Sequence, residues 1–178
     1  TPPQINELLK AARASRNPDL YLVCVLCLST GCRWGEAEAL TMDRVKNCAV
    51  TFTNTKGKRN RTIPITAELQ KQLLDHGRPG QHWIFRDCMV AFDRMAARLT
   101  FKLPRGQSTH ILRHTFASYF IQNGGDILTL QRILGHASIT MTMRYAHLAP
   151  GHLESARTIN PLCGQFVDTG GNLETLTH

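Results

Sequence analysis

Residues 20–28 read LYLVCVLCL, and this apolar run is the strongest fold signal in the chain. It contains nine residues and no charge. A helix needs about 20 apolar residues to cross a bilayer, so the run suits a buried helix better than a membrane span. The residues directly before it, NPD at 17–19, are typical of a helix start. We therefore expect a helix from about residue 20 at the centre of the core.

The chain on either side of this run mostly favours helices. Residues 1–4, TPPQ, combine a capping threonine, an early proline and a capping-box glutamine, which predicts a helix start. After the glycine at position 31, residues 34–40 predict a short helix. Further helices are expected at 67–75, 87–100, 109–123, 126–134, 139–146 and 150–157.

One β-rich segment interrupts the helices. Residues 45–53 favour a strand, residues 55–58 have turn chemistry, and residues 61–65 favour a returning strand. Pro64 restricts that second strand to a sheet edge or a strand end, because proline cannot donate to a ladder. The expected fold class is therefore α+β: mainly α with a small antiparallel β-sheet.

The composition indicates one domain with a full hydrophobic core. The chain has 178 residues, of which 42% are hydrophobic, and this length needs no disulfides. Cys24 and Cys27 resemble half of a zinc site, but no second half follows and their surroundings are apolar. We expect free thiols in a reducing compartment. The six cysteines are Cys24, Cys27, Cys32, Cys48, Cys88 and Cys163.

The charge points to a polyanionic partner. The net charge is +8, with a pI near 9.5. Residues 44–61 and 94–113 are both rich in basic residues and contain no acid. Two such stretches favour nucleic acid as the partner, although a solvated basic surface is the ordinary alternative.

Several familiar site types are excluded by their missing motifs. No glycine-rich nucleotide-binding motif occurs. His110 and His114 have the spacing of a zinc-protease helix, but Ile111 stands where that motif needs glutamate, and Arg113 would repel a dication. We expect neither a metal nor an organic cofactor.

Phosphate-binding groups stand instead at the ends of segments. Arg33 follows a glycine turn, Lys56 lies at the hairpin tip, and Arg113 lies one helical turn after His110. Arginines bind phosphate through paired hydrogen bonds, and histidine carries protons near neutral pH. Tyr145, with an intrinsic pKa of about 10, needs a base or a cationic cluster to attack well.

Each of these residues also has an ordinary interpretation. Arg33 could simply pair with Glu36, and Lys56 could belong to a solvated turn. His110 could cap its helix, and Tyr145 could be a half-buried aromatic. Order and spacing therefore decide the interpretation: His136 lies 23 positions after Arg113 and 9 positions before Tyr145.

In this order and spacing the chain resembles the tyrosine recombinase (phage integrase) family, and most of all the integrases of temperate bacteriophages. The resemblance spans roughly residues 1–160 and implies the catalytic-domain fold of that family. The matching stretches are TGCRWGEA (30–37), TKGKRNRTIPI (55–65), HILRHTFAS (110–118), LGHAS (134–138) and RYAHL (144–148).

The resemblance implies a role for each matching residue. Tyr145 would be the nucleophile, and Arg33 and Arg113 would clamp the phosphate. Lys56 would protonate the leaving 5′ oxygen, with Lys58 as its rival. The remaining roles are proton handling by His110, a phosphate hydrogen bond from His136, and orientation of the cluster by Glu36. Other expected DNA contacts are Lys58, Arg59, Arg61, Arg105 and Arg144.

The implied activity is site-specific DNA recombination through a 3′-phosphotyrosyl intermediate, without metal or ATP, to integrate or excise phage DNA. One alternative is a type IB-like topoisomerase with the same covalent chemistry. Another is a basic DNA-binding module without catalysis.

The resemblance also implies the organisation and partners of the protein. Residues 1–160 would form the catalytic domain, and residues 161–178 a tail that docks on a neighbouring protomer. An N-terminal DNA-binding domain, usual in the family, would be missing from this chain. The expected partners are double-stranded attachment sites, further copies in a dimer or synaptic tetramer, and accessory DNA-bending proteins. The expected location is the cytoplasm of a bacterial host, at the nucleoid when acting.

Overall fold

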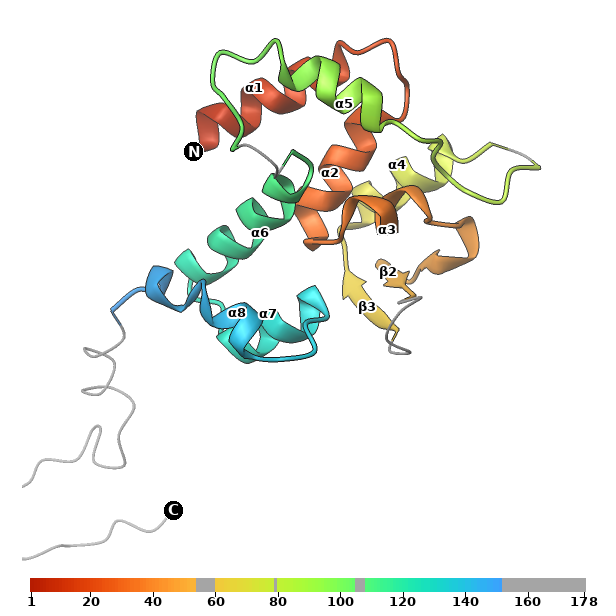
Figure 1. Ribbon diagram of the computed structural model, residues 1–178. Helices are drawn as coiled ribbons and strands as arrows, with labels where there is room; N and C mark the ends of the chain where they lie inside the picture. Colours follow the sequence, from red (N-terminus) through yellow and green to blue (C-terminus); the bar gives the residue numbers. More distant parts are fainter. Residues whose placement is uncertain (54–59, 79, 105–107, 152–178) are drawn as a thin grey trace, which may run out of the picture.

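The computed structural model describes residues 1–53, 60–78, 80–104 and 108–151 (Figure 1). The predicted central helix is α2 (Leu20–Thr30), and seven of its eleven residues are buried. It packs against α1 (Pro2–Arg13), α3 (Trp34–Glu38) and α6 (His110–Gln122). A helix that is apolar on most sides needs neighbours on most sides, and these three helices cover much of α2, while Tyr21, Val25 and Leu28 stay partly exposed.

Helix starts follow the capping residues that the sequence predicts. Thr1 and Gln4 form a capping box at the start of α1, where proline occupies the first helical turn. At α7 (Ile127–Leu134), the Asp126 side chain accepts a hydrogen bond from the Thr129 N–H. Each cap satisfies backbone donors that a helix leaves unpaired in its first turn.

The sheet has three antiparallel strands in the order β1 (Val45–Lys46), β2 (Ala49–Phe52) and β3 (Arg61–Pro64). Val50 pairs with Ile63, and both side chains are buried. As predicted, Pro64 ends an edge strand. The 3-10 helix η1 (Met42–Arg44) leads into the sheet. The turn that would carry Lys56, Lys58 and Arg59 lies outside the described residues.

The later helices are α4 (Ala67–His76), α5 (Met89–Ala96), α6, α7 and α8 (Thr140–Met143), followed by the 3-10 helix η2 (Ala146–Leu148). Two predicted ends were wrong. The α5 prediction ran to residue 100, but Thr100 gives its N–H and hydroxyl to the Glu7 carboxylate, which leads the chain away from the helix. The α8 prediction ran to residue 146, but the chain tightens after Met143 into η2. The helix expected at 150–157 lies almost wholly outside the described residues.

The buried side chains form two clusters. The larger surrounds α2 and includes the inner faces of the sheet, α4 and α5. The smaller lies between α6, α7 and η2 and consists of Ala117, Ile121, Leu130, Leu134 and Tyr145. In Figure 1, α6 runs from the larger helical body toward the pair α7 and α8. Helix α6 therefore belongs to both clusters, with Leu112 in the larger one.

Cys24, Cys27, Cys32 and Cys88 are buried free thiols, and Cys48 is an exposed one; Cys163 lies outside the described residues. Among the helices that the structure describes, none is long and apolar enough to span a bilayer.

Candidate active site

A crevice of about 1000 Å³ opens between α3, β2 and the first residues of α6 on one side and the end of α7 on the other. It brings together Arg33, Glu36, His110 and His136, which are up to 103 positions apart in the sequence. Each of these residues stands at or near the end of a helix, where the backbone turns and the side chain reaches solvent. The crevice is therefore the candidate site.

Arg33 enters the crevice because α2 ends in a tight turn. Gly31 caps α2 with a φ of +64°, a left-handed conformation that favours glycine. Arg33 then starts α3, and its N–H and Nη1 donate to the Glu36 carboxylate at 2.7 and 3.0 Å. The Arg33 side chain is 38% exposed, so its guanidinium still faces solvent on one side.

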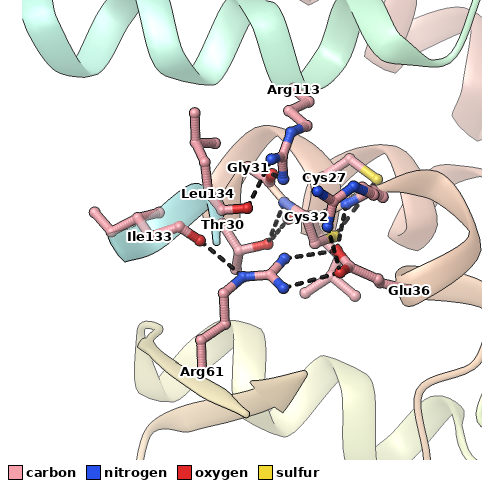
Figure 2. A network of polar contacts seen from close by, with 11 residues as sticks. Cys27, Thr30, Gly31, Cys32, Glu36, Arg61, Arg113, Ile133 and Leu134 are labelled. Carbon is pink, nitrogen blue, oxygen red and sulfur yellow. Dashed lines mark hydrogen bonds and ion pairs between the residues drawn. The ribbon is translucent and has the colours of Figure 1, made fainter. Parts of the chain in front are cut away.

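Arg113 is buried behind the crevice and ties two helix ends together. Its Nη1 donates to the Gly31 carbonyl and its Nη2 to the Leu134 carbonyl, both at 2.7 Å (Figure 2). Burial lowers the pKa of Arg113 to about 10, and the nearby charges of Arg33 and Arg61 add to this effect. Three guanidinium groups therefore lie within electrostatic reach of each other, which is a site prepared for an anion.

Glu36 offsets part of this positive charge. Its two carboxylate oxygens accept hydrogen bonds from Arg61 Nη1 and Nη2 at 2.8 and 2.6 Å (Figure 2). Burial alone would raise the pKa of Glu36, but the bonds and charges of Arg61 and Arg33 outweigh burial and lower it to about 2. Glu36 is therefore ionised at neutral pH and holds both arginines in place.

Arg61 lies in a different environment from the one predicted for it. Its side chain is 9% exposed. Its Nε donates to the Ile133 carbonyl at 2.8 Å, and its Nη1 and Nη2 donate to the Glu36 carboxylate. We expected a DNA contact here. The structure instead commits this guanidinium to bonds that join β3 to α3 and α7, because the alternation of β3 turns the side chain inward.

His136 follows the left-handed Gly135 that ends α7. Its Nδ1 lies 2.9 Å from the Oγ1 of the buried Thr142. Burial, and then the charges of Arg113 and Arg33, lower the pKa of His136 to about 4, so the ring is neutral at pH 7. The Thr142 hydroxyl can donate to Nδ1, an arrangement that leaves the ring proton on Nε2 for a phosphate oxygen.

Tyr145 belongs to the smaller apolar cluster and does not line the crevice. Its side chain is 6% exposed, and its Oη lies 2.5 Å from Nδ1 of His114 on α6. Burial raises the pKa of Tyr145, although the charges of Arg144 and Arg113 act against it. Burial lowers the pKa of His114. Near neutral pH, therefore, a protonated phenol can donate to a neutral imidazole.

The histidine in contact with Tyr145 is thus His114, whereas the sequence had suggested His110 for this partnership. His110 is exposed and lines the crevice. Arg144, next to the tyrosine, is exposed as a DNA contact would need to be. The predicted contacts Lys56, Lys58, Arg59 and Arg105 lie outside the described residues.

Three further crevice residues were missed by sequence reasoning. Arg44 donates through Nη1 to Thr53 Oγ1 at 2.9 Å. His82 and Trp83 contribute an edge-to-face aromatic pair, and Trp83 is 56% exposed. In the sequence, Arg44 is distinguished only as part of the basic stretch 44–61, and no motif marks His82 or Trp83 as a site residue.

Within the described part of the chain, no group of three or more His, Cys, Asp or Glu side chains could hold a metal ion. The donor set of the crevice is mainly cationic and suits a phosphate better than a cation.

Known proteins resemble this chain in sequence and in fold. A family model described as "Phage integrase family" matches residues 1–152. The integrase of Haemophilus phage HP1 is 54% identical over 159 residues, which cover 89% of this chain and 46% of that protein. This chain thus spans about half the length of the curated relatives it matches.

Solved structures with the same fold include members of this family. The catalytic domain of bacteriophage HP1 integrase superposes with a TM-score of 0.83 at 51% identity, covering 91% of this chain and 94% of that one. The Tn1549 transposon integrase, in complex with circular intermediate DNA, has a TM-score of 0.69 at 23% identity, covering 89% of this chain and 64% of that one. The second likeness concerns the fold alone.

Proposed function

Because this chain belongs to the phage integrase family, we propose that it cuts and rejoins DNA strands as the catalytic domain of a site-specific recombinase. The observation that carries the proposal is the crevice itself. It joins Arg33, His110 and His136 beside a buried Arg113, and the donor set suits a phosphate. The net charge of +8 is consistent with duplex DNA as the substrate.

The chemistry follows from these groups. The Tyr145 oxygen attacks the scissile phosphorus, a P–O bond to tyrosine forms, and the bond to the 5′ oxygen breaks. Arg33 and Arg113 stabilise the additional negative charge on the phosphorane, the electrostatic contribution that usually dominates. Lys56 would give the leaving oxygen its proton. A 5′ hydroxyl from a partner strand reverses the same steps, so neither metal nor nucleotide is consumed.

The proton of Tyr145 has a defined first acceptor. His114 Nδ1 lies 2.5 Å from the phenol oxygen and is neutral near pH 7. We therefore assign the first proton transfer to His114, and we keep His110, which faces the crevice, as a group that contacts the phosphate or relays the proton. Since Tyr145 is buried, the segment around η2 must shift when DNA binds so that the phenol oxygen can reach the phosphorus.

The decisive experiment is Tyr145→Phe tested on nicked attachment-site DNA. We expect the covalent protein–DNA adduct to disappear, while noncovalent binding persists because the phosphate-binding groups are untouched. Denaturing gels measure the adduct, and a mobility shift measures binding. Tyr119→Phe on α6 is a matched control that should retain the adduct. An undiminished adduct in the Tyr145 variant would contradict the assignment.

Two alternatives give different products. A type IB-like topoisomerase would relax a supercoiled plasmid and yield no recombinant, whereas the proposed recombinase exchanges strands between two attachment-site duplexes. A basic binding module without catalysis would form no adduct at all. Membership of the phage integrase family favours the recombinase over both alternatives.

The biological context of this activity is also a proposal. We propose that the protein integrates and excises phage DNA in the cytoplasm of a bacterial host, at the nucleoid. It would act as a dimer and a synaptic tetramer, helped by accessory DNA-bending proteins. Residues 161–178 would dock on a neighbouring protomer, and an N-terminal DNA-binding domain, usual in the family, would contribute further DNA contacts.

A further inference from the structure

A second hollow of about 990 Å³ lies outside the crevice and is strongly basic. The α1–α2 connection, the segment around residues 78–87 and α5 form its walls, and it shares no lining residue with the crevice. Arg94 and Arg98, from the acid-free basic stretch at 94–113, therefore lie outside the proposed catalytic site. Five arginines line the hollow: Arg16, Arg78, Arg86, Arg94 and Arg98.

Little negative charge offsets these arginines. The hollow contains two acids, Asp19 and Asp87. Asp19 is 1% exposed, and its carboxylate is already bound by His76 and by the backbone N–H of Arg86, with Arg78 at 3.7 Å. The Asp87 carboxylate accepts from the Met89 N–H.

Four of the arginines are exposed, and none of these four forms an ion pair with another residue that the structure describes. They are Arg16, Arg86, Arg94 and Arg98. A planar guanidinium binds phosphate through two parallel hydrogen bonds, so several exposed guanidinium groups around one hollow form a surface suited to phosphates.

The hollow lies directly behind one wall of the crevice. Within segment 82–89, His82, Trp83 and Met89 line the crevice. Arg86 and Asp87 of the same segment line the hollow. The rim between them is exposed, with Trp83 at 56% and Val90 at 60%. A duplex that passed from the crevice over this rim would meet the arginines next.

We propose that this arginine hollow binds the phosphate backbone of the duplex that flanks the cleavage site. The inference rests on the proposed function, in which the crevice holds the scissile phosphate. Duplex DNA carries a negative charge about every 1.7 Å along its axis, so a flanking arm offers phosphates to several arginines at once. An acidic face of a second copy fits less well, because the 13 acids of this chain form no run.

The test removes two of these charges with Arg94→Gln/Arg98→Gln. Both side chains are exposed and lie four positions apart, so the fold should tolerate the change. Lys71→Gln/Arg132→Gln removes two exposed charges from outside both hollows and serves as the matched control. Binding of a duplex of about 40 base pairs is measured by anisotropy over a series of salt concentrations.

We expect the slope of log affinity against log salt to become shallower by about 2 in the hollow variant, because each lost phosphate contact contributes about 0.9. At low salt its Kd should rise on the order of tenfold. The control should match the parent. A parental slope and affinity in the hollow variant would overturn the proposal.

A second readout tests whether the hollow acts on flanking DNA. The half-saturating concentration for adduct formation is compared on nicked attachment-site duplexes of about 12 and about 40 base pairs, the shorter spanning about 40 Å, the width of one domain. The variant should need more of the long duplex and the same amount of the short one, with equal adduct at saturation. Equal losses on both lengths would reject a flanking site.

Other outcomes separate the remaining possibilities. Saturable binding of inorganic phosphate that the hollow variant loses, with unchanged affinity for long DNA, would assign a small-anion site and overturn the proposal. If parent and variants all lack the adduct, the proposed function fails, while the salt dependence of binding still tests the hollow on its own.

Discussion

At the scale of single residues, the environment of His136 makes the stability of the fold depend on pH. The pKa of this ring falls from an ordinary 6.5 to about 4 because of burial and the nearby arginines. As the pH drops from about 6.5 toward about 4.5, the unfolded chain takes up a proton that the folded chain resists. The free energy of unfolding should therefore decrease with acidification in this window.

His136→Gln should flatten that dependence, because glutamine does not titrate. Urea unfolding at several pH values measures it. The window stays above the ordinary 4.5 of glutamate, so Glu36 contributes little to the slope. His114, whose pKa is also lowered, should leave a residual slope in the variant. An identical slope in parent and variant would show that His136 is protonated equally in both states.

His114 carries a second prediction. His114→Phe leaves the buried Tyr145 hydroxyl without its partner, and an unpaired buried polar group costs about 1–3 kcal/mol. We expect a loss of stability in that range and a slower rate of adduct formation at saturating DNA. His114→Asn, which can still pair with the hydroxyl, should recover the stability but not the rate. If His114→Asn recovered both the stability and the rate of adduct formation, His114 would have a structural role and no role in proton transfer.

The residue scale also shows what the sequence could and could not predict. The motif order predicts Arg33, Arg113 and His136 as members of one site, because each stands within a short distinctive stretch, and the structure places them close together. It did not identify the pairing of His114 with Tyr145, since 31 positions separate them and only the packing of η2 against α6 brings them together.

At the scale of elements, the end of α2 is the tightest position in the site. A Cβ on Gly31 would lie 2.5 Å from Phe116 and 2.9 Å from Leu134, and its φ is +64°. Gly31→Ala should therefore combine left-handed strain with overpacking, and destabilise the domain by about 2–4 kcal/mol. Its carbonyl also accepts from Arg113, so adduct formation should fall as well.

Gly124→Ala is the matched control for backbone strain. Gly124 has a φ of +86°, and nothing lies within 4 Å of the position of its Cβ. This variant should lose only about 1 kcal/mol and keep full activity. Thermal and urea unfolding compare the two, and equal losses would mean that the contacts with Phe116 and Leu134 relax without cost.

Elements were predicted well where local signals act alone. Caps and glycines defined α1, α2 and α7 because those signals depend on neighbours in sequence. Predictions failed at the ends of α5 and α8. After α5, the chain is held by the distant Glu7 carboxylate, and after α8 it changes to the 3-10 helix η2. Neither feature has a recognisable pattern in the local sequence.

At the scale of the whole molecule, positive charge concentrates around the crevice with Glu36 as its main counter-charge. Burial, and then repulsion by the charges of Arg33 and Arg61, lower the pKa of Arg113. An anion bound between them should relieve this repulsion and stabilise the fold by linkage. We expect sulfate to raise the Tm more than chloride does at equal ionic strength.

Arg33→Gln distinguishes specific binding from the general stabilising effect of sulfate, which acts by exclusion from protein surfaces. The variant should retain the general effect and lose the additional increase in Tm. An equal sulfate response in parent and variant would show that the crevice does not bind the anion.

If the chain cleaves DNA as proposed, the place of Tyr145 in the smaller apolar cluster also protects DNA that is not its target. Withdrawing a buried aromatic side chain costs about 2–3 kcal/mol, and each 1.4 kcal/mol changes a population about tenfold. A chance encounter with unrelated DNA offers general backbone contacts but little to repay that cost. Accidental strand breaks should therefore be rarer by a factor on the order of 50 than in a protein whose tyrosine always faces solvent.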